Sequence, residues 1–285
     1  MIPTPFGYTR ATSIDDAVAK LRDANGGGKL LAGGHSLIPV MKLRLNQPGT
    51  LIDIARIPEL RGIRADGGRI EIGAGTVHHD VATSAMLQKD CPLIAETAAS
   101  IGDPQVRNRG TLGGSLAHAD PSADYPAALL ALDAEIRIRG TGGSRAVPAS
   151  SFFRGLFSVD LAADEIIVGV QFTAVRTAAY AKLYQRASHF AIVGVAAALE
   201  VSKGVIQSAR VGLTGAGPSA TRLENVETAL VGQPATAAHV EAASRLAGTG
   251  LSELNGDIHA SAEYRRAMIP VFTERALTRA MARQR

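Results

Sequence analysis

The spacing of apolar residues changes twice along the chain. In the first 55 residues, Ile14, Val18 and Leu21 recur at helical spacing behind Ser13, whose side chain suits a helix N-terminus. Short apolar runs at 29–32 and 51–54 are typical of buried strands, and the pattern over 37–45 predicts a helix with Pro39 in its first turn. Together these elements predict a small unit of the βαβ type.

Between residues 56 and 176, several short stretches alternate apolar and polar positions with a period of two. Residues 63–72, with a turn at 66–68, predict one β-hairpin, and residues 135–139, followed by a turn at 140–143, predict a second. Residues 165–172 predict one more strand, and residues 80–88, 92–100 and 123–132 predict helices. We expect an antiparallel sheet flanked by helices, and no regular structure over the Gly- and Pro-rich stretch 101–122.

The last third begins with strands and ends with helices. Residues 180–186, 191–201 and 205–214 predict strands, and three Ala-rich stretches at 221–231, 236–247 and 261–282 predict helices. A boundary near residue 176 would separate this part from the sheet before it. The pattern therefore predicts an α+β protein with two domains, in agreement with its length of 285 residues.

Composition excludes several kinds of site. Cys91 is the single cysteine, so the chain can form no internal disulfide and can hold no thiolate zinc site or iron–sulfur cluster of its own. A net charge of +4 without a Lys- or Arg-rich run, and an aromatic content of 4% without Trp, argue against nucleic acid as a partner. The longest apolar stretch, 190–199, is far shorter than the roughly 20 residues of a membrane helix, and no secretory signal is visible, so we expect no membrane span and a cytoplasmic location.

Two glycine loops carry the candidate chemistry. The first, Ala32-Gly33-Gly34-His35-Ser36, leads from a predicted strand into a predicted helix. Backbone amides exposed at such a position attract anions, and glycine lets a phosphate approach the backbone closely. The alternative interpretation is an ordinary strand-to-helix turn with a Ser cap.

The second glycine loop, Thr111-Leu112-Gly113-Gly114-Ser115, lies within the long stretch 101–124 and repeats the combination of paired glycines and hydroxyls. Long loops without regular structure are usually functional in compact proteins. Two such loops suit a diphosphate held from two sides, and the Asp124 carboxylate could accept hydrogen bonds from ligand hydroxyls. The alternative is a surface loop without a ligand.

Other motifs fit a site less well. The segment 215–220 matches a dinucleotide-binding glycine pattern, but Pro218 removes an amide and no acidic strand end follows, so we expect a turn. Ser115, His118 and Asp120 lie too close in sequence for a catalytic triad, whose members come from distant positions.

The adjacent residues His78 and His79 would point to opposite faces of a strand, which makes them poor joint metal ligands. We expect both to be surface histidines. The sequence therefore assigns no metal ligand to this chain, and none of these motifs is assigned as catalytic.

With its two glycine loops in this order, the sequence resembles the FAD-binding medium subunit of molybdenum hydroxylases, the group that contains aerobic carbon monoxide dehydrogenase, xanthine dehydrogenase and nicotine dehydrogenase. The segments 186–194 and 257–265 are also similar to that family, and the resemblance covers the whole chain. It implies a vanillyl-alcohol-oxidase-like (PCMH-type) FAD-binding domain over residues 1–176, built of two α/β subdomains at about 1–55 and 56–176. A C-terminal domain with a small antiparallel sheet and helices would occupy 177–285.

The resemblance also implies the residues that contact the cofactor. The two glycine loops would hold the FAD diphosphate through backbone amides, Asp124 matches a family carboxylate that contacts FAD, and Phe190 would face the isoalloxazine ring. The preceding residue, His189, departs from the family, which often has Asp there, and an imidazole differs in charge from a carboxylate beside the ring. The full set carried over is Ala32, Gly33, Gly34, His35, Ser36, Leu37, Ile101, Gly102, Thr111, Gly113, Gly114, Ser115, Asp124, Ile167, Lys182 and Phe190.

In the family, substrate is oxidised at a molybdopterin in a large subunit, and electrons pass through two [2Fe-2S] clusters of a small subunit to FAD and on to an external acceptor. The resemblance therefore implies FAD in this chain, and molybdopterin and [2Fe-2S] clusters only in partner subunits. It further implies a dimer of heterotrimers, cytoplasmic or associated with the inner face of the membrane through its acceptor.

Two alternatives remain open: a self-sufficient FAD-dependent oxidase or dehydrogenase of the same superfamily, and a non-enzymatic nucleotide-binding module. Neither the substrate (CO, a purine, an N-heterocycle or an aldehyde) nor the acceptor follows from the sequence.

Overall fold

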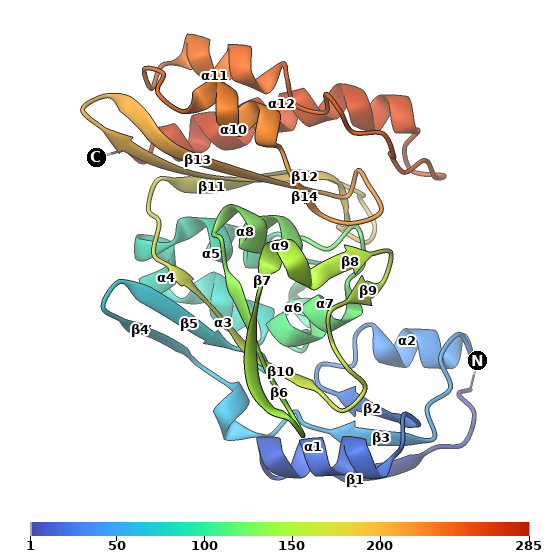
Figure 1. Cartoon of the computed structure of the whole chain (residues 1–285). Helices are drawn as coiled ribbons and strands as arrows, with labels where there is room; N and C mark the ends of the chain where they lie inside the picture. Colours follow the sequence, from blue (N-terminus) through green and yellow to red (C-terminus); the bar gives the residue numbers. More distant parts are fainter. Residues whose placement is uncertain (1, 285) are drawn as a thin grey trace.

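The chain starts with a three-stranded parallel sheet in the order β1-β3-β2. Figure 1 shows it at the N-terminal end of the computed structural model, which describes residues 2–284. The Ser13 hydroxyl caps the first helix by accepting a hydrogen bond from the Asp16 amide, as its position predicts. The predicted βαβ-type unit is confirmed, and its elements are β1 (Gly7–Arg10), α1 (Ile14–Asp23), β2 (Gly28–Leu31), α2 (Leu37–Lys42) and β3 (Thr50–Asp53).

A five-stranded antiparallel sheet in the order β4-β5-β10-β6-β7 forms the middle of the molecule. Both predicted hairpins and the later strand are confirmed. The strands are β4 (Ile63–Asp66), β5 (Arg69–Gly73), β6 (Glu135–Gly140), β7 (Gly143–Pro148) and β10 (Ile166–Thr173), with the 3-10 helix η1 (Pro58–Leu60) before them.

Helices cover one face of this sheet. Ile72, Ile138 and Val170 of the sheet share one hydrophobic core with Leu93 and Leu129 of the helices. The helix predicted over 80–88 is two helices, because Ser84 interrupts it and its hydroxyl caps the second one. The covering helices are α3 (His78–Thr83), α4 (Ala85–Asp90), α5 (Pro92–Ala99) and α8 (Tyr125–Ala131).

The prediction of no regular structure over 101–122 is wrong. The stretch contains α6 (Pro104–Arg107) and α7 (Leu112–His118), whose N-caps Asp103 and Thr111 accept hydrogen bonds from the amides of Val106 and Gly114. Helices of one or two turns are too short to show apolar periodicity. For the same reason α9 (Ala149–Phe152), β8 (Phe153–Gly155) and β9 (Ser158–Val159) were not predicted.

The last third forms an antiparallel sheet in the order β11-β12-β13-β14, covered by helices. The predicted strands and helices are confirmed with shifted ends, except that residues 221–222, predicted to begin a helix, form the short strand β14. The segment 215–220 is a bend without helix or strand, in keeping with the expected turn. The elements are β11 (Ala178–Tyr184), β12 (Ala191–Ser202), β13 (Val205–Thr214), β14 (Thr221–Arg222), α10 (Glu224–Leu230), α11 (Ala237–Ser244) and α12 (Ala262–Met281).

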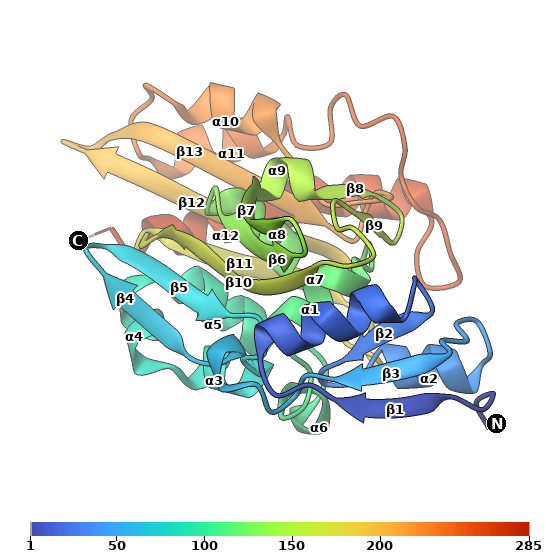
Figure 2. The same cartoon turned by 60° about the horizontal axis from the view of Figure 1, so that its bottom comes forward.

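The two faces of this last sheet belong to different cores. Along β11, Ala178 and Tyr180 pack in the core that contains α5 and α8, whereas Ala179 and Ala181 pack in the core of α10, α11 and α12. This alternation follows from the period of two in a strand. Figures 1 and 2 show the sheet between the two helical layers, so the C-terminal part is joined to the rest through an apolar interface.

None of the helices in residues 2–284 combines the length and apolarity that crossing a bilayer requires.

Candidate functional site

The two glycine loops touch each other. Gly33 lies between β2 and α2, and a Cβ added to it would overlap the carbonyl oxygen of Arg109 and approach the Gly110 Cα to 2.9 Å. Arg109 and Gly110 directly precede Thr111, the first residue of the second loop. Any residue larger than glycine at position 33 would push the two loops apart.

The first loop leaves its backbone amides free. Among the described residues, none of the five successive amides from Gly33 to Leu37 donates a hydrogen bond to another group of the chain. Ser36 makes no side-chain cap at α2, which contradicts the interpretation of an ordinary Ser-capped turn. Gly34 has a φ of +76°, a conformation that favours glycine. Unpartnered amides next to glycine suit an anionic ligand.

The second loop uses its amides within the chain. The Leu112 amide donates to Thr76 O at 3.0 Å and the Gly113 amide to Ala74 O at 2.8 Å, while the Gly114 and Ser115 amides donate to the Thr111 hydroxyl and carbonyl. A Cβ on Gly113 would lie 2.5 Å from the Ala74 Cβ, so glycine here allows α7 to sit close to β5. This loop is anchored to the sheet, in contrast to the first.

The His78 side chain packs against Gly110, next to the contact between the two loops. The expectation of surface histidines on a strand is wrong for His78, which begins α3 and is only 4% exposed, while His79 is exposed. Its Nδ1 lies 3.1 Å from the Tyr125 hydroxyl, and a Cβ on Gly110 would meet its Nε2 at 2.6 Å. Burial lowers the pKa of His78 to about 4, with smaller contributions from the charges of His35 and Arg107, so the imidazole is neutral at pH 7.

A buried ion pair joins Asp124, at the start of α8, to Lys182 of β11. The Lys182 ammonium donates to Asp124 Oδ2 at 2.8 Å, and the Tyr180 hydroxyl donates to Asp124 Oδ1 at 2.6 Å. Both charged side chains are 5% exposed. Burial raises the pKa of Asp124, and the Lys182 ammonium and Tyr180 hydroxyl oppose this shift by stabilising the carboxylate. The contact of Tyr180 with Asp124 was not predicted, because the sequence of a strand does not show which distant residue a Tyr hydroxyl will bond to.

The turn after α5 holds Ile101 and Gly102. Arg107 Nη1 donates to the carbonyl oxygens of both residues at 2.9 Å, and His189 Nδ1 lies 2.7 Å from Gly102 O. Lys182 also donates to Ser100 O, at 3.0 Å. The structure therefore brings Ile101, Gly102, Asp124 and Lys182 to one place, with the exposed Phe190 next in the chain to His189.

Ile167 is placed differently from the other predicted residues. Its side chain is 4% exposed and belongs to the core under the sheet. Ile167 is linked to the second glycine loop through backbone hydrogen bonds of its neighbour Val168. Val168 O accepts from the Ala74 amide, and Ala74 O accepts from the Gly113 amide.

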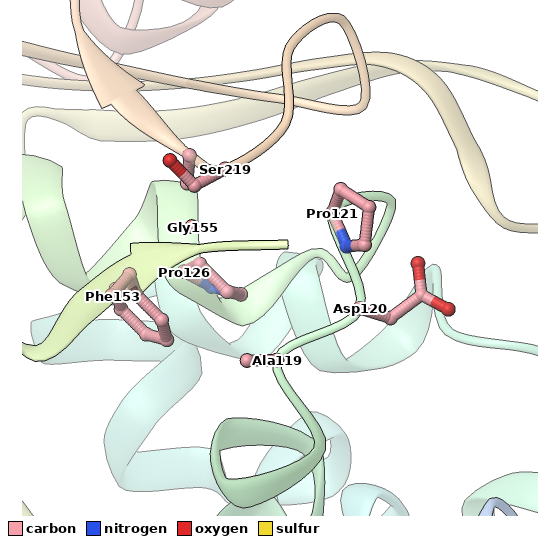
Figure 3. Close-up of a pocket in the computed structure, with 8 residues that line it drawn as sticks. Ala119, Asp120, Pro121, Pro126, Phe153, Gly155 and Ser219 are labelled. Atoms are coloured by element: carbon pink, nitrogen blue, oxygen red, sulfur yellow. The ribbon is translucent and has the colours of Figure 1, made fainter. Parts of the chain in front are cut away.

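A small pocket lies beyond the end of α7. Figure 3 shows it between the connection after α7, β8 and the segment before β14. It includes none of the residues predicted to bind the cofactor. Its lining residues are Ala119, Asp120, Pro121, Pro126, Phe153, Gly155, Ser219 and Ala220. Across residues 2–284, no group of three or more His, Cys, Asp or Glu side chains is placed to hold a metal ion.

Comparison with known proteins agrees with this geometry. A family model described as the FAD binding domain in molybdopterin dehydrogenase matches residues 4–172, and one described as the CO dehydrogenase flavoprotein C-terminal domain matches residues 178–280. The carbon monoxide dehydrogenase medium chain of Hydrogenophaga pseudoflava is 42% identical over 286 residues, which cover 99% of each chain. The nicotine 6-hydroxylase medium subunit of Paenarthrobacter nicotinovorans is 34% identical over 277 residues, which cover 97% of each chain.

A solved structure of the Hydrogenophaga pseudoflava carbon monoxide dehydrogenase matches with a TM-score of 0.95 and 43% identity, over 100% of both chains. Fold and site thus define a flavoprotein with a PCMH-type FAD-binding domain followed by a C-terminal sheet-and-helix domain. The chain belongs to the family of FAD-binding medium subunits of molybdenum hydroxylases, and the resemblance found in the sequence is confirmed. It is an oxidoreductase subunit, and its cofactor is FAD. The free amides of the first loop and the close approach at Gly33 fit the diphosphate of that cofactor.

Proposed function

We propose that this chain receives electrons from the [2Fe-2S] clusters of a partner subunit and passes them, through its FAD, to an external acceptor. The observation that carries the proposal is the contact of the two glycine loops beside five free amides, in a chain with a single, buried cysteine. When bound, FAD can exchange electrons one or two at a time, which connects one-electron clusters to a two-electron acceptor.

The residues of the chain would divide the work of binding. The amides from Gly33 to Leu37 would hold the diphosphate, because they have no partner in the protein. The second loop would supply shape and the hydroxyls of Thr111 and Ser115, since its amides from Leu112 to Ser115 are already engaged. This division refines the expectation that both loops bind through amides.

The residues after α5 would enclose the rest of the cofactor. Phe190 is an aromatic side chain 45% exposed at a hairpin tip, which suits stacking on a flat ring. Asp124 and Lys182 already form hydrogen bonds with each other, and they also bond to Tyr180 and to Ser100 O respectively. We therefore assign this pair to fixing the wall of the site, with further contacts to FAD through their remaining lone pairs and protons.

The assembly would contain two further kinds of subunit. The relatives are called medium chain or medium subunit, which implies smaller and larger chains beside them. We propose an iron–sulfur small subunit and a molybdopterin large subunit as partners, in a dimer of heterotrimers. The oxidised substrate would bind the large subunit, so this chain does not determine it.

The experiment is to purify the assembled complex through a tag on this chain and to remove FAD reversibly. We screen CO, N-heterocycles and aldehydes for bleaching of the iron–sulfur absorbance without oxygen, and then measure electron delivery to a soluble dye. Flavin removal should leave the bleaching intact and slow dye reduction by more than about tenfold, and added FAD should restore it.

Two results would contradict the proposal. Dye reduction that does not depend on FAD would favour a non-enzymatic nucleotide-binding role for this chain. Reduction of FAD by an organic substrate in the isolated chain, without partners, would favour the self-sufficient oxidase or dehydrogenase.

A further inference from the structure

Three basic side chains converge on one turn of backbone after α5. Lys182 of β11 donates to Ser100 O, Arg107 at the end of α6 donates to Ile101 O and Gly102 O, and His189 contacts Gly102 O. Carbonyl groups at a helix C-terminus lack partners within the helix and attract donors and positive charge. The turn is therefore held from three separate elements.

His189 is the member of this cluster that comes from a hairpin tip rather than from a helix or strand. It lies in the hairpin tip 185–190 between β11 and β12, and it bridges 87 residues to reach Gly102 with an Nδ1 to O distance of 2.7 Å. Because a carbonyl oxygen only accepts, Nδ1 must carry the proton and donate.

The backbone and a neighbouring ring hold His189 in position. Its φ is +60°, its amide donates to Gln185 O at 2.8 Å, and its ring meets the Tyr184 ring edge-on, with 5.3 Å between centroids. The other hydrogen bonds within the tip, among Gln185, Ser188 and Phe190, are local. Among residues 2–284, His189 to Gly102 is thus the one hydrogen bond that ties the tip to the rest of the protein.

We propose that His189 is a positioning residue that latches the tip 185–190 onto the Gly102 turn, holds Phe190 against bound FAD and slows FAD release. The inference rests on the proposed place of Phe190 beside the isoalloxazine ring. The half-exposed Phe190 follows His189 directly and precedes Ala191, whose amide donates to Ser122 O at 3.2 Å, so a tip freed from Gly102 would keep this restraint after Phe190 and lose the one before it.

Substitutions at one position can separate the donor from the backbone. Asn, Asp and Gly all tolerate a positive φ, but only Asn keeps an N–H near the place of Nδ1. His189→Asp and His189→Gly should release FAD about tenfold faster than the native chain, whereas His189→Asn should stay within about twofold of native. The measurement is the recovery of free flavin fluorescence after rapid dilution of the FAD-loaded full chain.

Controls keep the test independent of folding and of added charge. Arg186→Gln is in the same tip, and among residues 2–284 the Arg186 side chain forms no hydrogen bond or ion pair, so this variant should release FAD at the native rate. The Gly variant adds no charge, so it decides the outcome if the Asp variant fails to fold. The proposal is overturned if Gly releases FAD at the native rate, or if Asn releases it as fast as Gly. A native chain that never retains FAD would instead overturn the cofactor assignment.

Discussion

At the scale of single residues, the site depends on a glycine that leaves room for a close contact and on a histidine that is buried beside that contact. Gly33 has no room for a Cβ, and this lets the two glycine loops meet. His78 lies under the same junction with a neutral ring, wedged against Gly110 and 3.1 Å from the Tyr125 hydroxyl. A neutral imidazole can fill this place only at pH values above its lowered pKa.

The buried His78 predicts loss of stability in acid. Its pKa is about 4 in the folded chain and about 6.5 when unfolded, so between these values the unfolded state binds more protons. The stabilising contribution is complete above pH 6.5 and is lost as the pH falls towards 4. From this residue alone, the free energy of unfolding should drop by about 3 kcal/mol between pH 7 and pH 4.

Urea unfolding at a series of pH values measures this effect. His78→Asn should be less stable at pH 7 and should show a shallower decline on acidification, because it lacks the titrating ring. His79→Asn, altered at the exposed neighbour, should retain the native pH dependence. Equal slopes for the native chain and His78→Asn would refute the assignment.

At the scale of elements, β11 connects the C-terminal sheet to the site. Its Tyr180 and Lys182 reach Asp124, the N-cap residue of α8, while alternate residues of the strand pack on the opposite side. A buried charge that loses its partner is strongly destabilising, because its desolvation is no longer compensated. The register of β11 is therefore fixed by an ion pair as well as by packing.

This ion pair predicts a non-additive pair of mutations. Lys182→Met should lower the free energy of unfolding by about 3 kcal/mol, since it leaves the Asp124 carboxylate buried and unpaired. Combining it with Asp124→Asn should recover part of that loss, and Lys89→Met at an exposed position should change little. Chemical denaturation of the native chain, the single variants Lys182→Met and Asp124→Asn, and the double variant gives the coupling energy, and strict additivity of the two changes would contradict the role of the ion pair.

Elements were predictable from the sequence where they were long enough to show a period. The strands of the C-terminal sheet and the helix α12 repeat their pattern over many residues. The short α6 and α7 do not, and their capping residues Asp103 and Thr111 became visible as caps only in the structure. The break at Ser84 was missed because Ser is also tolerated inside a helix.

At the scale of the whole molecule, the site is shared by parts that are distant in sequence. The glycine loops come from the parallel sheet unit and from the helices on the central sheet, and the tip 185–190 comes from the C-terminal sheet. The C-terminal sheet lies between two layers of helices (Figure 1) and contributes to two hydrophobic cores, so it cannot move without exposing apolar surface. Domain boundaries at 176 and 55 stay predictions.

The sequence could identify the glycine loops and, by resemblance, the residues around them. It could not show that the amides of the second loop are engaged, because their partners Ala74 and Thr76 belong to another element. Nor could it show the burial of His78 or the contact from His189 to Gly102, since both depend on how separate segments pack. All three features depend on tertiary contacts, which the sequence alone does not reveal.

We propose that the close contact of the two glycine loops forms the FAD site. The most direct test of this claim is the dissociation constant of FAD for the full-length Gly33→Ala chain, measured by flavin fluorescence titration, with Gly142→Ala as a matched control in open space. We predict binding about 100-fold weaker for Gly33→Ala, and within about twofold of native for Gly142→Ala. Native affinity in Gly33→Ala, with both variants folded, would contradict the claim.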